Sequence, residues 1–300
     1  MSLHSAEGIP TGSRSRHRVG SPALFRPSST QELCALLAAH PDTVLVGGGL
    51  DVVNRMKEDS RPPSLTLLQG VADLARVACP EGGPLEIGAM VSHDTLAGHA
   101  LVRQHLPDLA AAWDRIANIR IRMQGTIGGN LCAGAPGYEA AVLLAVLGAE
   151  AGVIGSDGAA AAQPVGSEHG EAFTLRRGHC VTSLRLITAR AGTRRRLLYH
   201  RGLRPALWLA LGVDVDLQAG RVISARVALG GLHAGPLLRH PPMAGMPLAE
   251  LPRCAVDIAQ ATLATPGALA QPTLPWHGRA GYREKVAPVL LARLIAAVAA

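Results

Sequence analysis

The chain has 300 residues, of which 48% are hydrophobic and 17% charged, so it is long enough for about two folded domains and too apolar to be disordered. Its formal net charge is +7, but the basic residues are scattered and aromatic residues amount to only 3%. Nucleic-acid binding is therefore disfavoured, and docking to an acidic partner is preferred over solubility alone as the role of the charge.

The five cysteines lie far apart, without a CxxC pair or a histidine at ligand spacing. The sequence thus predicts no metal site on this chain and a reduced, cytoplasmic protein. Residues 1–20 are polar and carry arginines but no apolar core, so we expect a disordered tail there and no secretory signal. The longest apolar stretch starts at Ala140, is interrupted by Glu150, and is too short to span a membrane.

The first predicted unit is a helix, a strand and a glycine turn. Ser29 and Glu32 have the spacing of a capping box at the start of "SSTQELCALLAAH", whose leucines recur on one helical face. The β-branched "DTVLV" then predicts a short buried strand that ends in three consecutive glycines. Such glycines after a strand indicate that the backbone approaches something closely.

The second predicted unit begins near Leu85, with a strand in "LEIGAMVS". We expect a helix from Asp94, as its cap, through Arg103, and another in "DLAAAWDRIAN". His93 and Asp94 are interpreted as part of this helix cap rather than as a catalytic pair. A glycine-rich stretch, "IRIRMQGTIGGNLCAGAPGYE", precedes an apolar helix over Ala140–Ala149, and the Ala-rich "AAAAQPVGSEHGE" predicts a surface loop.

The composition changes beyond Thr193 and predicts a separate α+β domain. "RRRLLYH" is expected to be a strand, and "ALWLALGVDVDLQAGRVISARVALGG" to be a hairpin, because apolar and polar residues alternate on either side of an Ala-Gly turn. Helical patterns follow over Leu248–Thr265 and Tyr282–Ala299.

The chemical signal of the sequence is the pair of glycine loops "VGGGLD" and "GTIGGN". Consecutive glycines can form concave nests of backbone N–H groups that bind phosphate oxygens without a lysine. Thr126 can add a hydroxyl donor and Asn130 an amide. Two such nests suit the two halves of a pyrophosphate, which indicates a dinucleotide cofactor. The residues alone leave a second interpretation open, in which both loops are simply tight turns.

The segments "VLVGGGLD" and "IRMQGTIGGNLCAGAPGYE" resemble the FAD-binding subunit of molybdenum hydroxylases, the family of xanthine dehydrogenase and carbon monoxide dehydrogenase. The resemblance continues through "RVISARVALGGLHAGPLLRH" and "AGYREKVAPVLLARLI". It implies an α+β fold with a PCMH-type FAD-binding domain over residues 21–190, made of two α/β subdomains at about 21–80 and 81–190. A C-terminal α+β domain of the CO dehydrogenase flavoprotein type, with an antiparallel sheet and helices, would occupy residues 194–300.

The resemblance also implies residues that bind FAD. Glu139 stands where the family has an Asp that hydrogen-bonds the polyol region, and Ile116 where an apolar or aromatic residue packs against the isoalloxazine. Val181 matches a position near the flavin, and Arg201 one where a Lys often lies close to the ring system. The residues expected to hold the pyrophosphate are Val46, Gly47, Gly48, Gly49, Leu50, Asp51, Thr126, Gly128, Gly129 and Asn130.

Four residues depart from the family pattern. Leu50 replaces the polar residue of AGGTDL, and Met123 replaces the Asn of IRN. Ala135 replaces the Ser of SPxxD, and Glu139 is one methylene longer than the Asp. Loss of a hydroxyl donor to a charged phosphate costs about 1.5–3 kcal/mol of binding free energy, so Leu50 is the departure with the clearest effect.

Two functions follow from the resemblance. The first is an FAD-binding electron-transfer subunit with no catalytic residue of its own, which takes electrons from the [2Fe-2S] clusters of a small subunit. A large subunit carries the molybdenum cofactor in such a complex, expected to be a dimer of heterotrimers. The alternative is a scaffold or interaction subunit of the same kind of complex that has weakened or lost its flavin.

Overall fold

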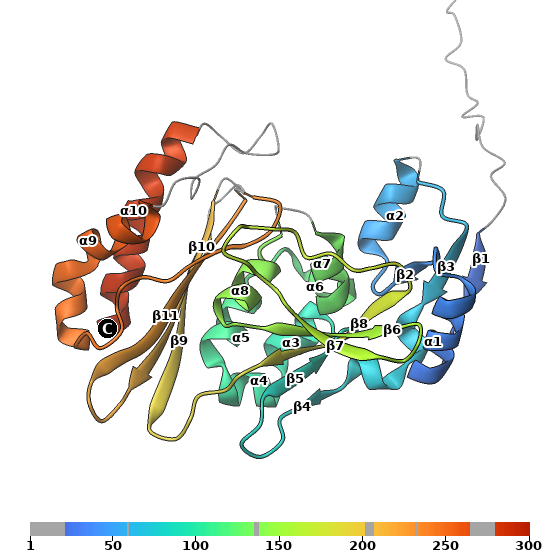
Figure 1. Ribbon diagram of the computed structural model, residues 1–300, viewed down its shortest axis with the longest axis horizontal. Helices are drawn as coiled ribbons and strands as arrows, with labels where there is room; N and C mark the ends of the chain where they lie inside the picture. The colour runs from blue at the N-terminus through green and yellow to red at the C-terminus, as the bar shows by residue number, and fades with distance from the viewer. Residues whose placement is uncertain (1–21, 59, 135–137, 202–206, 232, 265–279) are drawn as a thin grey trace, which may run out of the picture.

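The computed structural model describes residues 22–58, 60–134, 138–201, 207–231, 233–264 and 280–300. The predicted tail over residues 1–20 lies outside this range. The fold is a mixture of helices and three sheets, which confirms the expected α+β class. In Figure 1 the four-stranded sheet with helices α9 and α10 lies on the left, a helical layer and the five-stranded sheet lie in the middle, and the three-stranded sheet lies on the right.

The N-terminal part is a parallel three-stranded sheet in the order β1-β3-β2, packed with two helices. The expected capping box starts α1, where Ser29 Oγ accepts the N–H of Glu32 at 3.1 Å. The Glu32 carboxylate reaches back to the N–H of Ser28, one residue earlier than predicted, at 2.7 Å. The elements are β1 (Ala23–Phe25), α1 (Thr30–Ala39), β2 (Val44–Val46), α2 (Leu50–Lys57) and β3 (Ser64–Leu67).

The central part is an antiparallel five-stranded sheet in the order β4-β5-β8-β6-β7, covered by short helices. Its strands are β4 (Val77–Ala78), β5 (Leu85–Gly88), β6 (Glu150–Gly155), β7 (Ala160–Pro164) and β8 (His179–Leu186). Its helices are α3 (His93–Gly98), α4 (Ala100–His105), α5 (Pro107–Trp113), α6 (Ile119–Gln124), α7 (Ile127–Ala133) and α8 (Ala140–Val146). Short 3-10 turns occur at Leu68–Gly70, Ala72–Ala75, Leu248–Glu250 and Ala297–Ala299.

Three local predictions for this part are wrong. The helix expected from Asp94 is capped by Ser92, whose hydroxyl accepts the N–H of Thr95, and it breaks at His99 into α3 and α4. The glycine-rich stretch contains two helices, α6 and α7. The Ala-rich loop contains β7, an edge strand whose backbone pairs with β6 although its side chains have little strand propensity.

The C-terminal part is an antiparallel four-stranded sheet in the order β12-β11-β10-β9, with two helices on its outer face. The predicted hairpin is confirmed as β10 and β11, and both predicted helices are present. In the described part of the chain, no helix is long and apolar enough to cross a membrane. The elements are β9 (Thr193–Arg201), β10 (Trp208–Asp216), β11 (Arg221–Gly230), β12 (Leu237–Arg239), α9 (Leu251–Leu263) and α10 (Ala280–Ala296).

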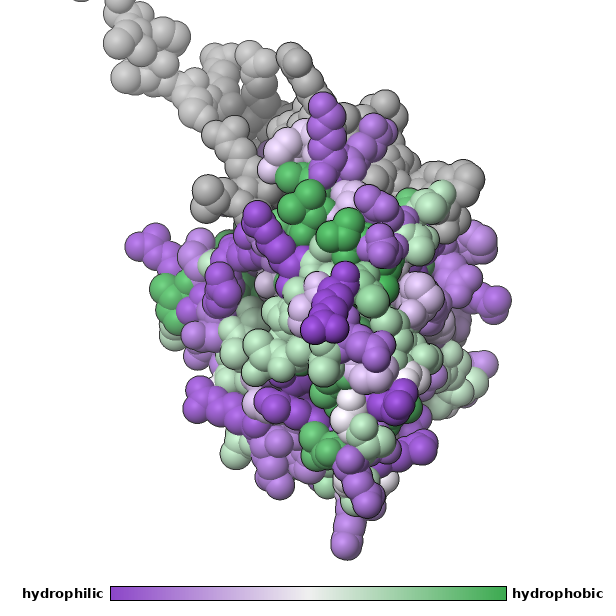
Figure 2. All heavy atoms as spheres, turned by 90° about the vertical axis from the view of Figure 1, so that its left-hand side faces the viewer, coloured by the Kyte–Doolittle hydropathy of each residue, from purple (hydrophilic) through white to green (hydrophobic). Residues whose placement is uncertain are grey.

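This sheet is covered on both faces. Leu209 and Leu211 of β10 pack into the core formed with α9 and α10. On the opposite face, a Cβ on Gly212 would lie 2.8 Å from the carbonyl oxygen of Val146, and a Cβ on Gly230 would lie 2.4 Å from Cγ2 of Val142. Helix α8 therefore lies directly on the sheet where two strands lack side chains. The outer face, at the left of Figure 1, is a mixture of hydrophilic residues and separate hydrophobic ones (Figure 2).

Candidate cofactor site

The two glycine loops contact each other. A Cβ on Gly48 would lie 1.9 Å from the carbonyl oxygen of Gln124, and a Cβ on Gly47 would lie 2.5 Å from Oγ1 of Thr126. The Gln124 side-chain amide also donates to the carbonyl oxygen of Gly48 at 2.8 Å. The close approach signalled by the first glycines is thus an approach to the second loop, and the two loops form one surface.

The first loop ends at the half-buried N-terminus of α2. Gly49 has a φ of +79°, a left-handed conformation that favours glycine, and it precedes the helix without any side-chain cap. Leu50 is the first residue of α2, and Asp51 forms an ion pair with Arg55 at 2.7 Å. The first backbone N–H groups of a helix have no intrahelical partners and carry partial positive charge, so this end of α2 can bind an anion.

The second loop continues into α7. Thr126 is 5% exposed, and its Oγ1 caps α7 by accepting the N–H of Gly129 at 3.2 Å. Gly128 packs against Ala89, where a Cβ would lie 2.6 Å away from the Cβ of that residue. Oδ1 of Asn130 is buried without a hydrogen-bond partner among the described residues. This oxygen therefore keeps the capacity to accept a hydrogen bond from a bound molecule.

The buried residue His93 holds the start of the second loop through a backbone hydrogen bond. His93 donates its backbone N–H to the carbonyl oxygen of Gly125 at 3.0 Å, and its Nδ1 accepts the indole N–H of Trp113 at 3.1 Å. Burial lowers the pKa of His93 to about 4, so the ring is neutral at physiological pH. Sequence reasoning assigned His93 to a helix cap, because nothing in its neighbourhood along the chain indicates Trp113 as its partner.

Glu139 is the centre of a hydrogen-bonded cluster. The residue is 6% exposed, and its carboxylate accepts the hydroxyl of Tyr199 and lies 3.3 Å from Nε of Arg201. It also accepts the N–H of Ala117, a residue with a left-handed φ of +49°, at 3.4 Å. Nη1 of Arg201 donates to the carbonyl oxygen of Arg115. The cluster therefore fixes the turn at residues 115–117 against strand β9.

Sequence reasoning missed Tyr199 in this cluster. Burial, with a further contribution from the Glu139 carboxylate, raises the pKa of Tyr199 far above its usual range, so the hydroxyl stays a donor. A strand pattern gives no sign that a tyrosine meets a glutamate from a distant helix. The one signal for Tyr199 is its position on β9 two residues before Arg201, because residues at this spacing lie on the same face of a strand.

The three remaining site residues are packed into the protein. Ile116 is 4% exposed, Val181 is 3% exposed, and Val46 is 7% exposed. Val181 pairs with Val153 across β8 and β6. Because these three side chains face the core, the segments that carry them can contact a bound molecule mainly through their backbone.

Tyr138, which precedes Glu139, lies within electrostatic reach of α2. The charges of Asp51 and Arg55 on α2 act on its hydroxyl, and burial together with Asp51 raises its pKa. Nη2 of Arg55 also donates to the carbonyl oxygen of Ala133 at 3.3 Å, which joins α2 to the end of α7.

A helix N-terminus and two glycine loops thus lie on one surface, an arrangement whose backbone N–H groups can bind phosphate oxygens. Residues 18–186, more than half of the chain, match the family model described as the FAD binding domain in molybdopterin dehydrogenase. The chain belongs to this family.

Two curated relatives show how far the similarity extends. The carbon monoxide dehydrogenase medium chain of Afipia carboxidovorans is 28% identical over 282 residues, which cover 92% of this chain and 96% of that protein. The caffeine dehydrogenase subunit beta of a Pseudomonas species is 33% identical over 127 residues, which cover 42% of this chain and 43% of that protein.

Solved structures are similar over nearly the whole chain. A crystal structure of the Cu,Mo-CO dehydrogenase in its cyanide-inactivated form matches with a TM-score of 0.77 and 26% identity, covering 94% of this chain and 99% of that chain. Quinoline 2-oxidoreductase from Pseudomonas putida 86 matches with a TM-score of 0.77 and 25% identity, covering 93% and 97%.

Proposed function

We propose that this chain is the FAD-binding electron-transfer subunit of a molybdenum hydroxylase. The observation that carries the proposal is the contact between the two glycine loops beside the uncapped N-terminus of α2. A pyrophosphate placed there would receive backbone N–H groups from Gly49, Leu50 and Asp51 on one side. The Thr126 hydroxyl and the side-chain N–H of Asn130 would donate from the second loop, while the unpaired Oδ1 of Asn130 would accept from a hydroxyl or N–H of the cofactor.

The remaining residues would orient the flavin. The carboxylate of Glu139 has about four acceptor positions, and three donors of the protein occupy three of them. One position therefore remains for a polyol hydroxyl. Arg201 would place positive charge near the ring system, while Ile116 and Val181 would shape the wall behind it. The bound flavin supplies one- and two-electron chemistry, and the protein supplies its position and electrostatic surroundings.

The assembly follows from the same proposal. Partner chains would carry the molybdenum cofactor and the [2Fe-2S] clusters, in a cytoplasmic dimer of heterotrimers. The five cysteines are free thiols, and the described residues contain no group of three metal ligands. We also propose that residues 21–190 act as the FAD-binding domain and residues 194–300 as a second domain, joined by the Glu139 cluster.

A scaffold subunit with weakened flavin binding is the second candidate. Leu50 favours it, because no hydroxyl stands at the first residue of α2. The engagement of Glu139 by Tyr199 and Arg201 also favours it, because this carboxylate already has an internal structural role.

Replacement of Gly48 tests the proposed function. Gly48→Ala puts a Cβ against the backbone of Gln124, and this clash must push the two loops apart. We therefore expect FAD affinity to fall at least about tenfold. Gly98→Ala is the control, because a Cβ there meets nothing within 4 Å. The measurement is FAD released per chain from the purified complex and its visible absorption. A folded wild-type complex without flavin would favour the scaffold instead.

A further inference from the structure

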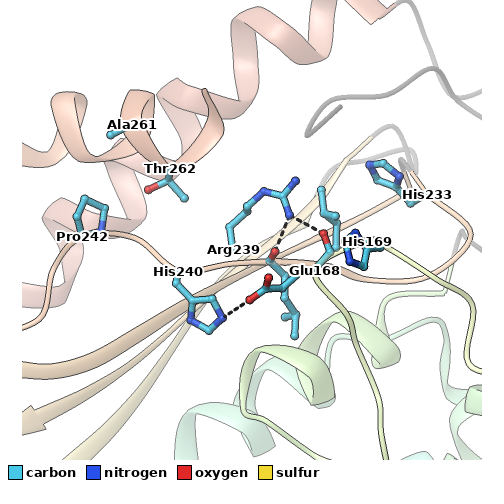
Figure 3. Close-up of a pocket in the computed structure, with 10 residues that line it drawn as sticks. Glu168, His169, His233, Arg239, His240, Pro242, Ala261 and Thr262 are labelled. Atoms are coloured by element: carbon cyan, nitrogen blue, oxygen red, sulfur yellow. Dashed lines mark hydrogen bonds and ion pairs between the residues drawn. The ribbon is translucent and has the colours of Figure 1, made fainter. Parts of the chain in front are cut away.

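A cavity lies between the central part and the C-terminal sheet, away from the glycine loops. Its volume is about 600 Å³, within the range of sites for small organic ligands. Figure 3 shows it bounded by the loop after β7, the segments around β12, and the end of α9. The loop and β12 are joined by backbone hydrogen bonds, from Leu238 to Ser167 at 2.8 Å and from Gly235 to Gly170 at 2.8 Å.

Arg239 is the principal charge in this cavity. Its Nη1 donates to the backbone carbonyl oxygens of Glu168 and Leu238, each at 2.8 Å, as Figure 3 shows. Among the described residues no carboxylate forms an ion pair with Arg239, and its Nε is buried without a hydrogen-bond partner. The guanidinium is thus held in place by neutral oxygens and keeps its charge uncompensated.

The other polar groups of the cavity do not supply the missing acceptor. The Glu168 carboxylate is directed to Nε2 of His240 at 3.5 Å, as drawn in Figure 3. Nε2 of His233 is, like Nε of Arg239, buried without a partner among the described residues. Two residues that line the cavity thus carry an unpaired nitrogen, which an acceptor bound in the cavity would satisfy.

We propose that this cavity binds a small organic anion, a carboxylate or phosphate monoester carried on an apolar body. Arg239 would bind the anionic group, since a guanidinium presents a planar fork of donors that matches these oxygens. Leu237 and Pro242, which also line the cavity, would contact the apolar body. The site shares no residue with the candidate FAD site, so the inference stands independently of the proposed function.

Titration calorimetry of the full chain with phenyl phosphate and with benzoate tests this inference, and the two probes distinguish the sources of the anion. Arg239→Gln should weaken binding of the preferred probe at least about tenfold, because a charge-assisted hydrogen bond is lost. Arg221→Gln is the matched control, since Nη1 of Arg221 also donates to a backbone carbonyl, that of Gly245, but outside the cavity. Benzyl alcohol, which is neutral, should not bind.

A second variant protects the test against misfolding of the first. His233→Gln changes the other unpaired nitrogen and should also weaken the preferred probe, with an unchanged melting temperature. The flavin content and absorption should stay constant throughout, which separates this site from the FAD site. The inference is overturned if neither probe binds at millimolar concentration, or if Arg239→Gln binds both probes as tightly as the wild type does.

Discussion

Leu50 occupies the first helical position of α2, where its N–H is free but its side chain offers no hydrogen bond. Leu50→Thr would restore a hydroxyl beside the proposed pyrophosphate. We expect FAD to bind at least about tenfold more tightly, since a hydrogen bond to a charged group contributes about 1.5–3 kcal/mol. Flavin fluorescence during titration of the flavin-free protein gives the dissociation constant.

Leu50→Val is the control for this change, because Val has the shape of Thr without its hydroxyl. It should bind FAD no better than the wild type does. An equal gain from Val and Thr would mean that shape matters at Leu50 and that no hydroxyl contact with phosphate exists. An unchanged or lower affinity with Thr would place Leu50 away from the phosphate.

Single residues show where sequence reasoning about the site stops. The glycine loops carry a local pattern, and the structure brings Gly48 and Gln124 together. Tyr199 carries no local pattern, because its role arises only when β9 meets the start of α8. The role of such a residue depends on which distant segment it contacts, and that contact exists only in the folded protein.

At the scale of elements, α3, α5 and α6 meet at the His93–Trp113 hydrogen bond. Burial lowers the pKa of His93 from 6.5 to about 4, so the unfolded chain binds the proton more readily than the folded one. This contribution to stability is complete above pH 6.5 and is lost as the pH falls toward 4. We expect it to reach about 3 kcal/mol in the free energy of unfolding.

Denaturant unfolding of His93→Gln between pH 7 and 4 measures this contribution, because the variant should be less stable at pH 7 and lose less stability on acidification. His105→Gln, on α4, is the control, and its free energy of unfolding should change with pH as that of the wild type does. The same slope in His93→Gln and the wild type would show that other groups cause the acid sensitivity.

Elements with strong local patterns could be predicted, and those formed by pairing could not. The capping box of α1, the alternation in β10 and the apolar face of α9 all act within a few residues. Strand β7 consists mainly of alanine, so only its pairing with β6 makes it a strand. Helices α6 and α7 lie in a glycine-rich segment whose composition indicates turns.

At the scale of the whole molecule, the Glu139 cluster ties the central part to the C-terminal sheet. Glu139→Gln removes the charge that Arg201 faces and weakens the hold on the turn at residues 115–117. Because the Arg201 side chain is 33% exposed, we expect a moderate loss of about 1–3 kcal/mol in the free energy of unfolding. FAD affinity should fall as well.

Asp108→Asn is the matched control, since Asp108 ties α5 to the same strand β9 through Arg196 Nε at 3.2 Å and the N–H of Leu197 at 3.0 Å. It should lower stability to a similar extent without an effect on FAD affinity. Thermal unfolding and flavin titration of both variants compare these effects. Equal losses of FAD affinity in the two variants would show that the Glu139 cluster has no particular part in orienting the flavin.

The packing of α8 on Gly212 and Gly230 also governs how the protein can be made. Six of the seven residues of α8 are buried, yet the strands that cover it are synthesised much later than the helix. A chain emerging at about 5–20 residues per second leaves this apolar helix uncovered for roughly several seconds. The segments around the proposed flavin site therefore reach their final packing only after translation of the hairpin, and ribosome-bound chains that stop before β10 should recruit chaperones.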